Sequence, residues 1–290
     1  MKKLEDQTIK DNFLFAAAMM EGDNCKRLLE MILNIEIERL HVNNEHTILY
    51  NPSYHGIRLD IYARDENNTR YDVEMQVASE NLPKRCRYYH SQLDMDSLEQ
   101  GSKYDKLPDT YVIFICDFDP VGLNKYLYRI ENVIVNCENK LFVDGNHTIL
   151  LSTKGMDDEN VSDELIKFLK YVAADLQASN SDFDSDYVRR LQQTISNVKQ
   201  SRRVRDEYML LEIMLDEEYE KGVNAGREEG RLEGREEGRE EGREEGRLEG
   251  QTVGELNARH SIAANMLAEG VDIETISHIT GLKEEDIINA

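Results

Sequence analysis

Two neighbouring segments that alternate polar and apolar residues constrain the fold of this chain more than any other feature. In residues 56–63 and again in 70–77, every second side chain is apolar, which predicts two strands with one apolar face each. On the first strand, Leu59 and Ile61 are expected to share that face. The polar stretch 64–69 between the segments has a length typical of a hairpin turn. We therefore expect an antiparallel β-hairpin here.

Asp60 and Glu74 both fall on the polar face of this hairpin, so their carboxylates could meet across the ladder. Two carboxylates this close repel each other unless a cation lies between them or one of them takes up a proton. Their oxygens suit Mg²⁺ or Mn²⁺, and Mg²⁺ usually takes one or two protein carboxylates and keeps its other positions for water and phosphate oxygens. The pattern thus allows a metal site for phosphodiester chemistry, or a half-exposed hairpin with a solvated polar face.

The motif around this hairpin resembles a known superfamily. Asp60, followed on the next strand by Glu74-Met75-Gln76, resembles the PD-(D/E)XK nuclease motif, with Gln76 where that superfamily more often has lysine. Further segments are similar to the recombination-promoting nuclease family, also called PD-(D/E)XK family transposases: residues 10–15, 87–89, 101–107, 151–155 and the Gly-Arg-Glu-Glu repeats. The resemblance covers nearly the whole chain.

The resemblance implies an α/β fold, a restriction-endonuclease-like mixed sheet flanked by helices, followed by a helical C-terminal extension. It also implies a metal-dependent DNA endonuclease linked to recombination or mobile elements, in which Asp60 and Glu74 hold Mg²⁺ or Mn²⁺ and Gln76 orients the attacking water. The ion would polarise the scissile phosphate and lower the pKa of that water.

Gln76 leaves other functions open, because an amide has no positive charge to stabilise hydroxide or the phosphorane. One alternative is a catalytically weak or inactive nuclease-fold protein that acts as a protein-interaction scaffold. Another is a ribonuclease, since this chemistry does not by itself select the sugar.

The net charge of −23 argues against a nucleic-acid partner, because phosphate binding depends on lysine and arginine. A local basic segment answers this objection. Lys84, Arg85 and Arg87 open a helix expected after a proline, and Lys103 and Lys106 follow it. We expect the first three to contact DNA, although a basic helix start is also an ordinary solvated surface.

Other sequence features bear on additional site residues, on zinc or disulfide sites and on localisation. Glu30, in the first predicted helix, is a candidate for an additional acidic site residue or simply a solvated glutamate. The four cysteines form no CxxC or Cys/His pattern, so they predict neither a zinc site nor a disulfide framework. No leader is recognisable and no apolar run approaches the roughly 18 residues that span a bilayer. We therefore expect a cytoplasmic protein without membrane segments.

Residues 1–180 read as the nuclease-like core. Hydrophobic periodicity predicts, in order, an amphipathic helical opening to about residue 40, β structure within 47–77, a helix after Pro83, strands near 110–116, 126–130, 140–143 and 148–151, and a helix over 162–178.

The remainder divides into a long helix (181–221), a repeat spacer (222–254) and a small helical module (255–290). Glycine recurs at every fourth residue of the spacer and costs a helix about 1 kcal/mol each time, which favours a frayed or partner-stabilised segment. The turn at 280–282 resembles that of a helix-turn-helix, but the acidic residues after it favour a protein contact over DNA. Homo-oligomers through these C-terminal helices are possible partners.

Overall fold

The computed structural model describes residues 3–48, 57–79 and 81–289. It separates into two compact units, Met1–Met214 and Leu215–Ala290. Part of the β structure expected within 47–77 therefore lies outside the described residues. In the described part of the chain, no helix is both long and apolar enough to cross a membrane.

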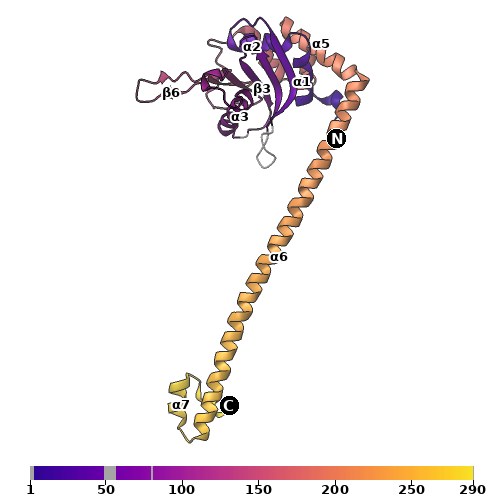
Figure 1. Ribbon diagram of the computed structural model, residues 1–290. Coiled ribbons are helices and arrows are strands. Elements are labelled where there is room, and N and C mark those ends of the chain that lie inside the picture. The colour runs from indigo at the N-terminus through magenta and orange to yellow at the C-terminus, as the bar shows by residue number, and fades with distance from the viewer. Residues whose placement is uncertain (1–2, 49–56, 80, 290) are drawn as a thin grey trace. The chain divides into compact units, whose positions relative to one another are not determined.

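The first unit is built on a mixed sheet of six strands in the order β1-β2-β3-β4-β8-β5 (Figure 1). The strands are β1 (Leu40–Ile48), β2 (Ile57–Asp65), β3 (Arg70–Gln76), β4 (Thr110–Cys116), β5 (Leu127–Ile130) and β8 (Asn146–Ser152). β1, β2 and β3 are antiparallel, β3, β4 and β8 are parallel, and β5 is antiparallel to β8. The predicted mixed α/β sheet is confirmed.

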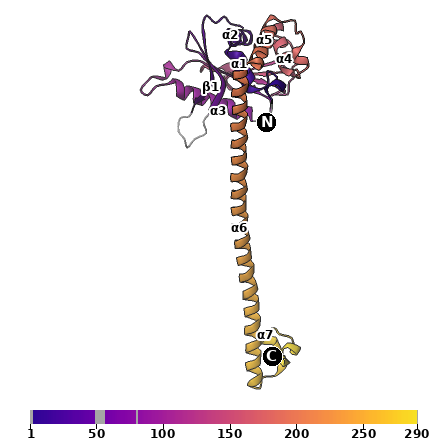
Figure 2. The ribbon, with the colours of Figure 1, turned by 90° about the vertical axis from the view of Figure 1, so that its right-hand side faces the viewer.

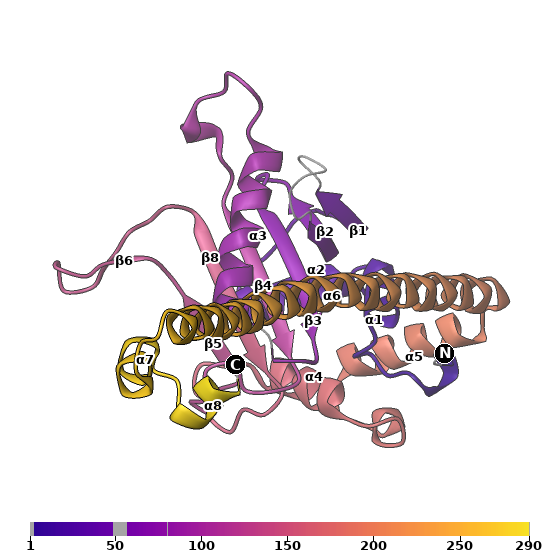
Figure 3. The same cartoon turned by 90° about the horizontal axis from the view of Figure 1, so that it is seen from below.

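Helices cover both faces of this sheet. On one face lie α1 (Asn12–Met20), α2 (Asn24–Leu33), α4 (Asp163–Ala173) and α5 (Asp186–Gln200), which pack around one large apolar core (Figure 2). On the other lies α3 (Leu82–Ser97), which crosses the central strands over a smaller core (Figure 3). Short 3-10 turns occur at Leu4–Asp6, Tyr104–Lys106 and Ala178–Asn180.

The predicted hairpin is β2 and β3, which pair antiparallel from Arg64 opposite Arg70 to Ile61 opposite Val73. One part of the predicted pattern is wrong. Ile61 packs in the larger core, but Leu59 packs in the core beneath α3. The alternation is lost between these residues, where the β2–β3 pairing ends, so the apolar face does not continue to Leu59.

Two strand boundaries also differ from the sequence expectations. β1 begins at Leu40, well before the expected start near residue 47. A small second sheet of β6 (Val133–Ile134) and β7 (Lys140–Leu141) projects from the main sheet (Figure 1), and β6 was not expected. Both misses involve strands with little periodic apolar signal.

The long helix expected over 181–221 is two helices, α5 and α6 (Arg202–Ala268), separated at Ser201. α6 runs through the glycine repeats, so the segment expected to be frayed or partner-stabilised is helical in this structure. Glutamate–arginine pairs one turn apart support the helix, such as Glu228 to Arg231 at 2.6 Å. In the second unit, the end of α6 packs with α7 (Ile273–Thr280) and α8 (Glu284–Ile288) around a small core, as the sequence predicts.

Candidate active site

Asp60 and Glu74 lie where the backbone pairing of β2 and β3 stops. Beyond the Ile61–Val73 pair, their side chains provide the cross-strand hydrogen bonds. Oδ2 of Asp60 accepts a hydrogen bond from the backbone N–H of Met75 at 3.1 Å. Oε1 of Glu74 accepts one from the backbone N–H of Asp60 at 3.0 Å. The two carboxylates are therefore brought together at one end of the hairpin.

The polar face of β3 is buried. Asp72, Glu74 and Gln76 are only 0%, 4% and 8% exposed. The alternative of a solvated polar face is therefore wrong for these three residues. Burial and the negative charge of Asp60 raise the pKa of Glu74 to about 7. The site thus holds acidic groups in surroundings that oppose their ionisation.

Asp72 is a member of this group that the sequence analysis did not single out. As a carboxylate it has no hydrogen-bond donor for either of its oxygens. A proton on Asp72 would allow a hydrogen bond to Glu74, and burial followed by the charge of Glu74 raises the pKa of Asp72 well above its ordinary value. Its surroundings therefore disfavour the ionised form of Asp72.

The guanidinium of Arg85, on the first turn of α3, lies against the same face. Nη2 lies 3.4 Å from Oε2 of Glu74 and donates to the hydroxyl of Tyr89 at 2.9 Å. Nη1 donates to Oε1 of Gln76 at 2.5 Å. Arg85 therefore partly offsets the negative charge at the end of the hairpin.

Gln76 has both halves of its amide engaged by protein groups. Its oxygen accepts from Arg85, and its nitrogen donates to the carbonyl of Ala78 at 2.5 Å. These partners fix the amide orientation, because arginine has only donors and a carbonyl only accepts.

An asparagine from α1 also reaches the site. Nδ2 of Asn12 donates to Oδ1 of Asp60 at 3.2 Å. Glu30, the acidic candidate from the first predicted helix, instead accepts from the backbone N–H of Ile37 at 3.0 Å and lies 3.6 Å from Lys26. Asn12 falls within the opening segment 10–15 that carried the family resemblance, and that was the available signal for it.

Beside Gln76, the carboxyl ends of the parallel strands gather further charged groups. The backbone N–H of Asp117, directly after β4, donates to the carbonyl of Gln76 at 3.0 Å. The carboxylate of Asp117 pairs with Lys10 at 2.9 Å and with Lys154 at 3.0 Å. The opening segment and the segment 151–155 therefore meet at the edge of the sheet that carries the site.

The other predicted DNA contacts are on the surface. Lys84 and Arg87 are exposed on α3, unlike Arg85, which turns to the carboxylates. Lys103 and Lys106 are also exposed, in the segment that follows α3.

The donor set suits a hard divalent ion that takes two protein ligands. Asp60 and Glu74 supply carboxylate oxygens, and a cation would oppose the effects of burial and of the Asp60 charge, which raise the pKa of Glu74. No arrangement of three or more histidine, cysteine, aspartate or glutamate side chains suited to a metal occurs among the described residues. A site of two carboxylates, completed by water and substrate oxygens, is what this geometry fits.

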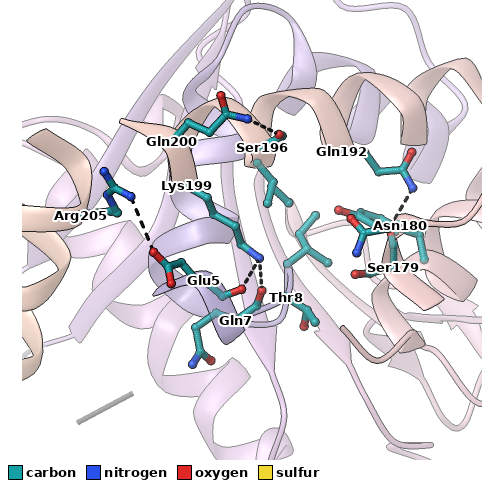
Figure 4. A pocket seen from close by; sticks show the side chains of 13 residues that line it. Glu5, Gln7, Thr8, Ser179, Asn180, Gln192, Ser196, Lys199, Gln200 and Arg205 are labelled. Atoms are coloured by element: carbon teal, nitrogen blue, oxygen red, sulfur yellow. Dashed lines mark hydrogen bonds and ion pairs between the residues drawn. The ribbon is translucent and has the colours of Figure 1, made fainter. Parts of the chain in front are cut away.

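A cavity of about 320 Å³ lies elsewhere, between the N-terminal segment, α5 and the start of α6 (Figure 4). Lys199 spans it and donates to the backbone carbonyls of Glu5 at 3.2 Å and Gln7 at 2.5 Å. Its lining contains none of the predicted site residues. Lys199 thus links α5 to the N-terminal segment, and the cavity does not belong to the carboxylate site.

A mixed sheet flanked by helices, with acidic side chains where the pairing of its second and third strands ends, defines a nuclease-like α/β domain. Residues 14–221 match the model of the PD-(D/E)XK nuclease family transposases, and the chain belongs to that family, which is linked to mobile elements. Residues 257–290 match the C-terminal HTH domain of the Rpn/YhgA-like nuclease family. No curated protein and no solved structure matched the chain.

Proposed function

We propose that this protein is a metal-dependent DNA endonuclease that hydrolyses phosphodiester bonds, with a role in recombination or in the movement of mobile elements. The observation that carries the proposal lies where the pairing of β2 and β3 ends. There the carboxylate of Glu74 accepts a hydrogen bond from the backbone of Asp60, and the carboxylate of Asp60 accepts one from the backbone of Met75. Membership of a nuclease family supports the same reaction class.

In this proposal, Asp60 and Glu74 hold Mg²⁺ or Mn²⁺. The bound ion would supply Lewis-acid polarisation of a phosphate oxygen and lower the pKa of a coordinated water. Burial and the negative charge of Asp60 raise the pKa of Glu74, and a bound divalent ion would favour its ionised form. Asn12, hydrogen-bonded to Asp60, would hold that carboxylate in one orientation.

The catalytic set we propose is Asp60, Glu74 and Gln76. Water adds to phosphorus, one ester P–O bond breaks, and the products are a phosphate monoester end and a hydroxyl end. The amide of Gln76 would have to exchange one of its hydrogen bonds, to Arg85 or Ala78, in order to orient that water directly.

The proposed DNA contacts are Lys84, Arg85 and Arg87, at the start of α3. Lys84 and Arg87 are exposed and suited to backbone phosphates, and Arg85 lies nearest the reaction centre. The net charge of −23 should keep binding weak, and the loss of affinity as salt rises should scale with the number of phosphates that these side chains neutralise.

The HTH domain supports a DNA partner for the chain as a whole. The first turn of its last helix, however, carries Glu284, Glu285 and Asp286, whose charges oppose phosphate binding. The contacts that we propose therefore lie on the nuclease domain.

The test is cleavage of supercoiled plasmid by the purified full chain, with and without Mg²⁺, for the parent, Asp60→Asn and Glu74→Gln. We expect Mg²⁺-dependent nicking by the parent and a loss of at least about 100-fold in both variants, since each removes a charged ligand. Calorimetric titration with Mg²⁺ should show weaker binding in both.

Glu30→Gln is the matched control, because Glu30 is a carboxylate of the same domain whose contacts are with Ile37 and Lys26. Its cleavage rate should equal that of the parent. A folded parent that binds DNA and Mg²⁺ without cutting would favour the scaffold function. Equal cleavage by parent, Asp60→Asn and Glu74→Gln would remove the site assignment, and preferential cleavage of RNA in a competition assay would indicate a ribonuclease.

A further inference from the structure

Arg85 places a permanent positive charge directly beside the acidic site. Its Nη2 lies 3.4 Å from Oε2 of Glu74, and the Arg85 side chain is 26% exposed. The guanidinium therefore contacts the carboxylate that we propose as a metal ligand and still reaches the surface. An arginine cannot lose its proton under these conditions, so this charge is present at every working pH.

Several groups hold the guanidinium in place. Its guanidinium carbon lies over two rings, 5.0 Å from the ring centre of Phe114 and 5.3 Å from that of Tyr89. The Tyr89 hydroxyl accepts a hydrogen bond from Nη2 at 2.9 Å. Stacking and hydrogen bonds together fix a planar cation better than either does alone. The charge is therefore preorganised, and reaction would require little movement of it.

Gln76 contributes to the same arrangement. Its oxygen accepts from Nη1 of Arg85, while its nitrogen is tied to the carbonyl of Ala78. A neutral amide in this position cannot offset the negative charge that grows on a phosphate under attack. It can, however, hold a cation that does.

We propose that Arg85 is a catalytic residue of this nuclease: its guanidinium donates hydrogen bonds to a non-bridging oxygen of the scissile phosphate and offsets the charge of the transition state. Tyr89 is a positioning residue that aims it. The amide oxygen of Gln76 also aims it, while the amide nitrogen of Gln76 would exchange the carbonyl of Ala78 for the attacking water. Arg85 keeps all of its protons throughout, so no proton transfer passes through it. The inference rests on the proposed nuclease function and deepens it by naming the source of positive charge that Gln76 lacks.

A purely structural role for Arg85 makes different predictions. If Arg85 only neutralises Glu74, its removal should destabilise the fold without metal, and Mg²⁺ should restore both stability and cleavage. If Arg85 acts on the phosphate, its removal should slow cleavage even when Mg²⁺ and DNA are saturating. The rate of P–O bond cleavage at saturating Mg²⁺ and DNA therefore distinguishes the two roles.

The experiment uses the full chain as parent, Arg85→Met, Arg85→Lys and the double variant Arg85→Met with Gln76→Lys. Urea unfolding checks the fold, calorimetry measures Mg²⁺ affinity, and anisotropy measures affinity for a DNA duplex in Ca²⁺. Single-turnover cleavage in saturating Mg²⁺ gives the rate of the chemical step. Arg190→Met, at an exposed arginine on α5, is the matched control and should leave that rate unchanged.

We expect Arg85→Met to lower the single-turnover rate by about 100-fold at saturating Mg²⁺ and DNA, in addition to any change in DNA or Mg²⁺ affinity from removing this cation. Arg85→Lys should lose about tenfold, because lysine keeps the charge but lacks the planar fork. The double variant should recover about tenfold over Arg85→Met, because the Gln76→Lys substitution returns a cation to the same end of the hairpin.

A parent that cleaves DNA together with an Arg85→Met variant that cleaves equally fast would overturn this inference and leave the nuclease function intact. A parent that does not cleave at all would instead overturn the proposed function.

Discussion

In the nuclease domain, acidic side chains such as Asp72 and Glu74 are buried against a sheet, whereas in the repeat part of α6 the glutamates are exposed and pair with arginines one turn away. Burial raises the pKa values of Asp72 and Glu74, and Arg85 lies close to Glu74 as a cationic neighbour. Exposure leaves the glutamates of the repeat helix screened by water. The difference indicates that burial opposes the ionisation of the carboxylates at the site, whereas the exposed pairs of the repeat helix give it modest support.

The largest expected contrast is in packing. Phe168→Ala should lower the free energy of unfolding of the nuclease domain by about 3 to 5 kcal/mol, because Phe168 is fully buried against Tyr187. Leu232→Ala in the repeat helix should change it by less than about 0.5 kcal/mol, since Leu232 is 52% exposed. Urea unfolding followed by tyrosine fluorescence measures both, and equal losses would contradict the contrast.

A second prediction concerns how the stability of the nuclease domain depends on pH. Burial lowers the pKa of His90 from 6.5 to about 4, with its ring nitrogens 2.9 Å from the hydroxyls of Thr110 and Thr148. Below pH 6.5 the unfolded chain binds a proton that the folded chain resists, so stability falls as the pH drops from 6.5 to 4, by on the order of 3 kcal/mol in total.

His90→Gln should flatten this dependence, because glutamine keeps hydrogen-bonding groups but does not titrate. Urea midpoints of the parent and the variant at pH 7.5 and pH 5 provide the measurement. A parent whose loss of stability between these two pH values matches that of His90→Gln would show that His90 is not the source.

Substitutions in the glycine repeats should have a smaller effect of opposite sign, because they should stabilise the helix. A Cβ added at Gly230, Gly234 or Gly238 meets no atom within 4 Å. Alanine at these sites should therefore stabilise the helix by about 1 kcal/mol each. Circular dichroism should show greater helix content on heating, with unchanged unfolding of the nuclease domain. Loss of helix content in the triple variant would mean that the glycines make close contacts in an assembly.

The smallest effect is expected from the exposed ion pairs. Arg231 contacts Glu228 and Arg247 contacts Glu244, each at 2.6 Å. Replacing both glutamates with glutamine should cost only a few tenths of a kcal/mol of helix stability per pair, and less at high salt. Helix melting at low and high NaCl tests this, and a loss comparable to that of Phe168→Ala would reverse the comparison.

How far the sequence could predict the fold depended on the periodicity of each segment. The nearly all-apolar strand β4 was predicted with its observed bounds, Thr110–Cys116, because a buried central strand is marked by composition alone. β6 was missed because its two residues are exposed. The helix through the repeats is not evident from composition, because the low helix propensity of glycine masks the regular glutamate–arginine pairs along it.

By itself, the sequence determined that the segments carrying Asp60 and Glu74 pair as a hairpin, since two alternating segments joined by a short polar turn specify one. Only the tertiary structure decided that Asp72 is buried without a donor, that Asn12 reaches Asp60, and that Arg85 turns inward. These contacts depend on how α1 and α3 pack on the sheet. Hydrophobic periodicity specifies which face of an element is buried, but it does not specify which distant polar group that face will meet.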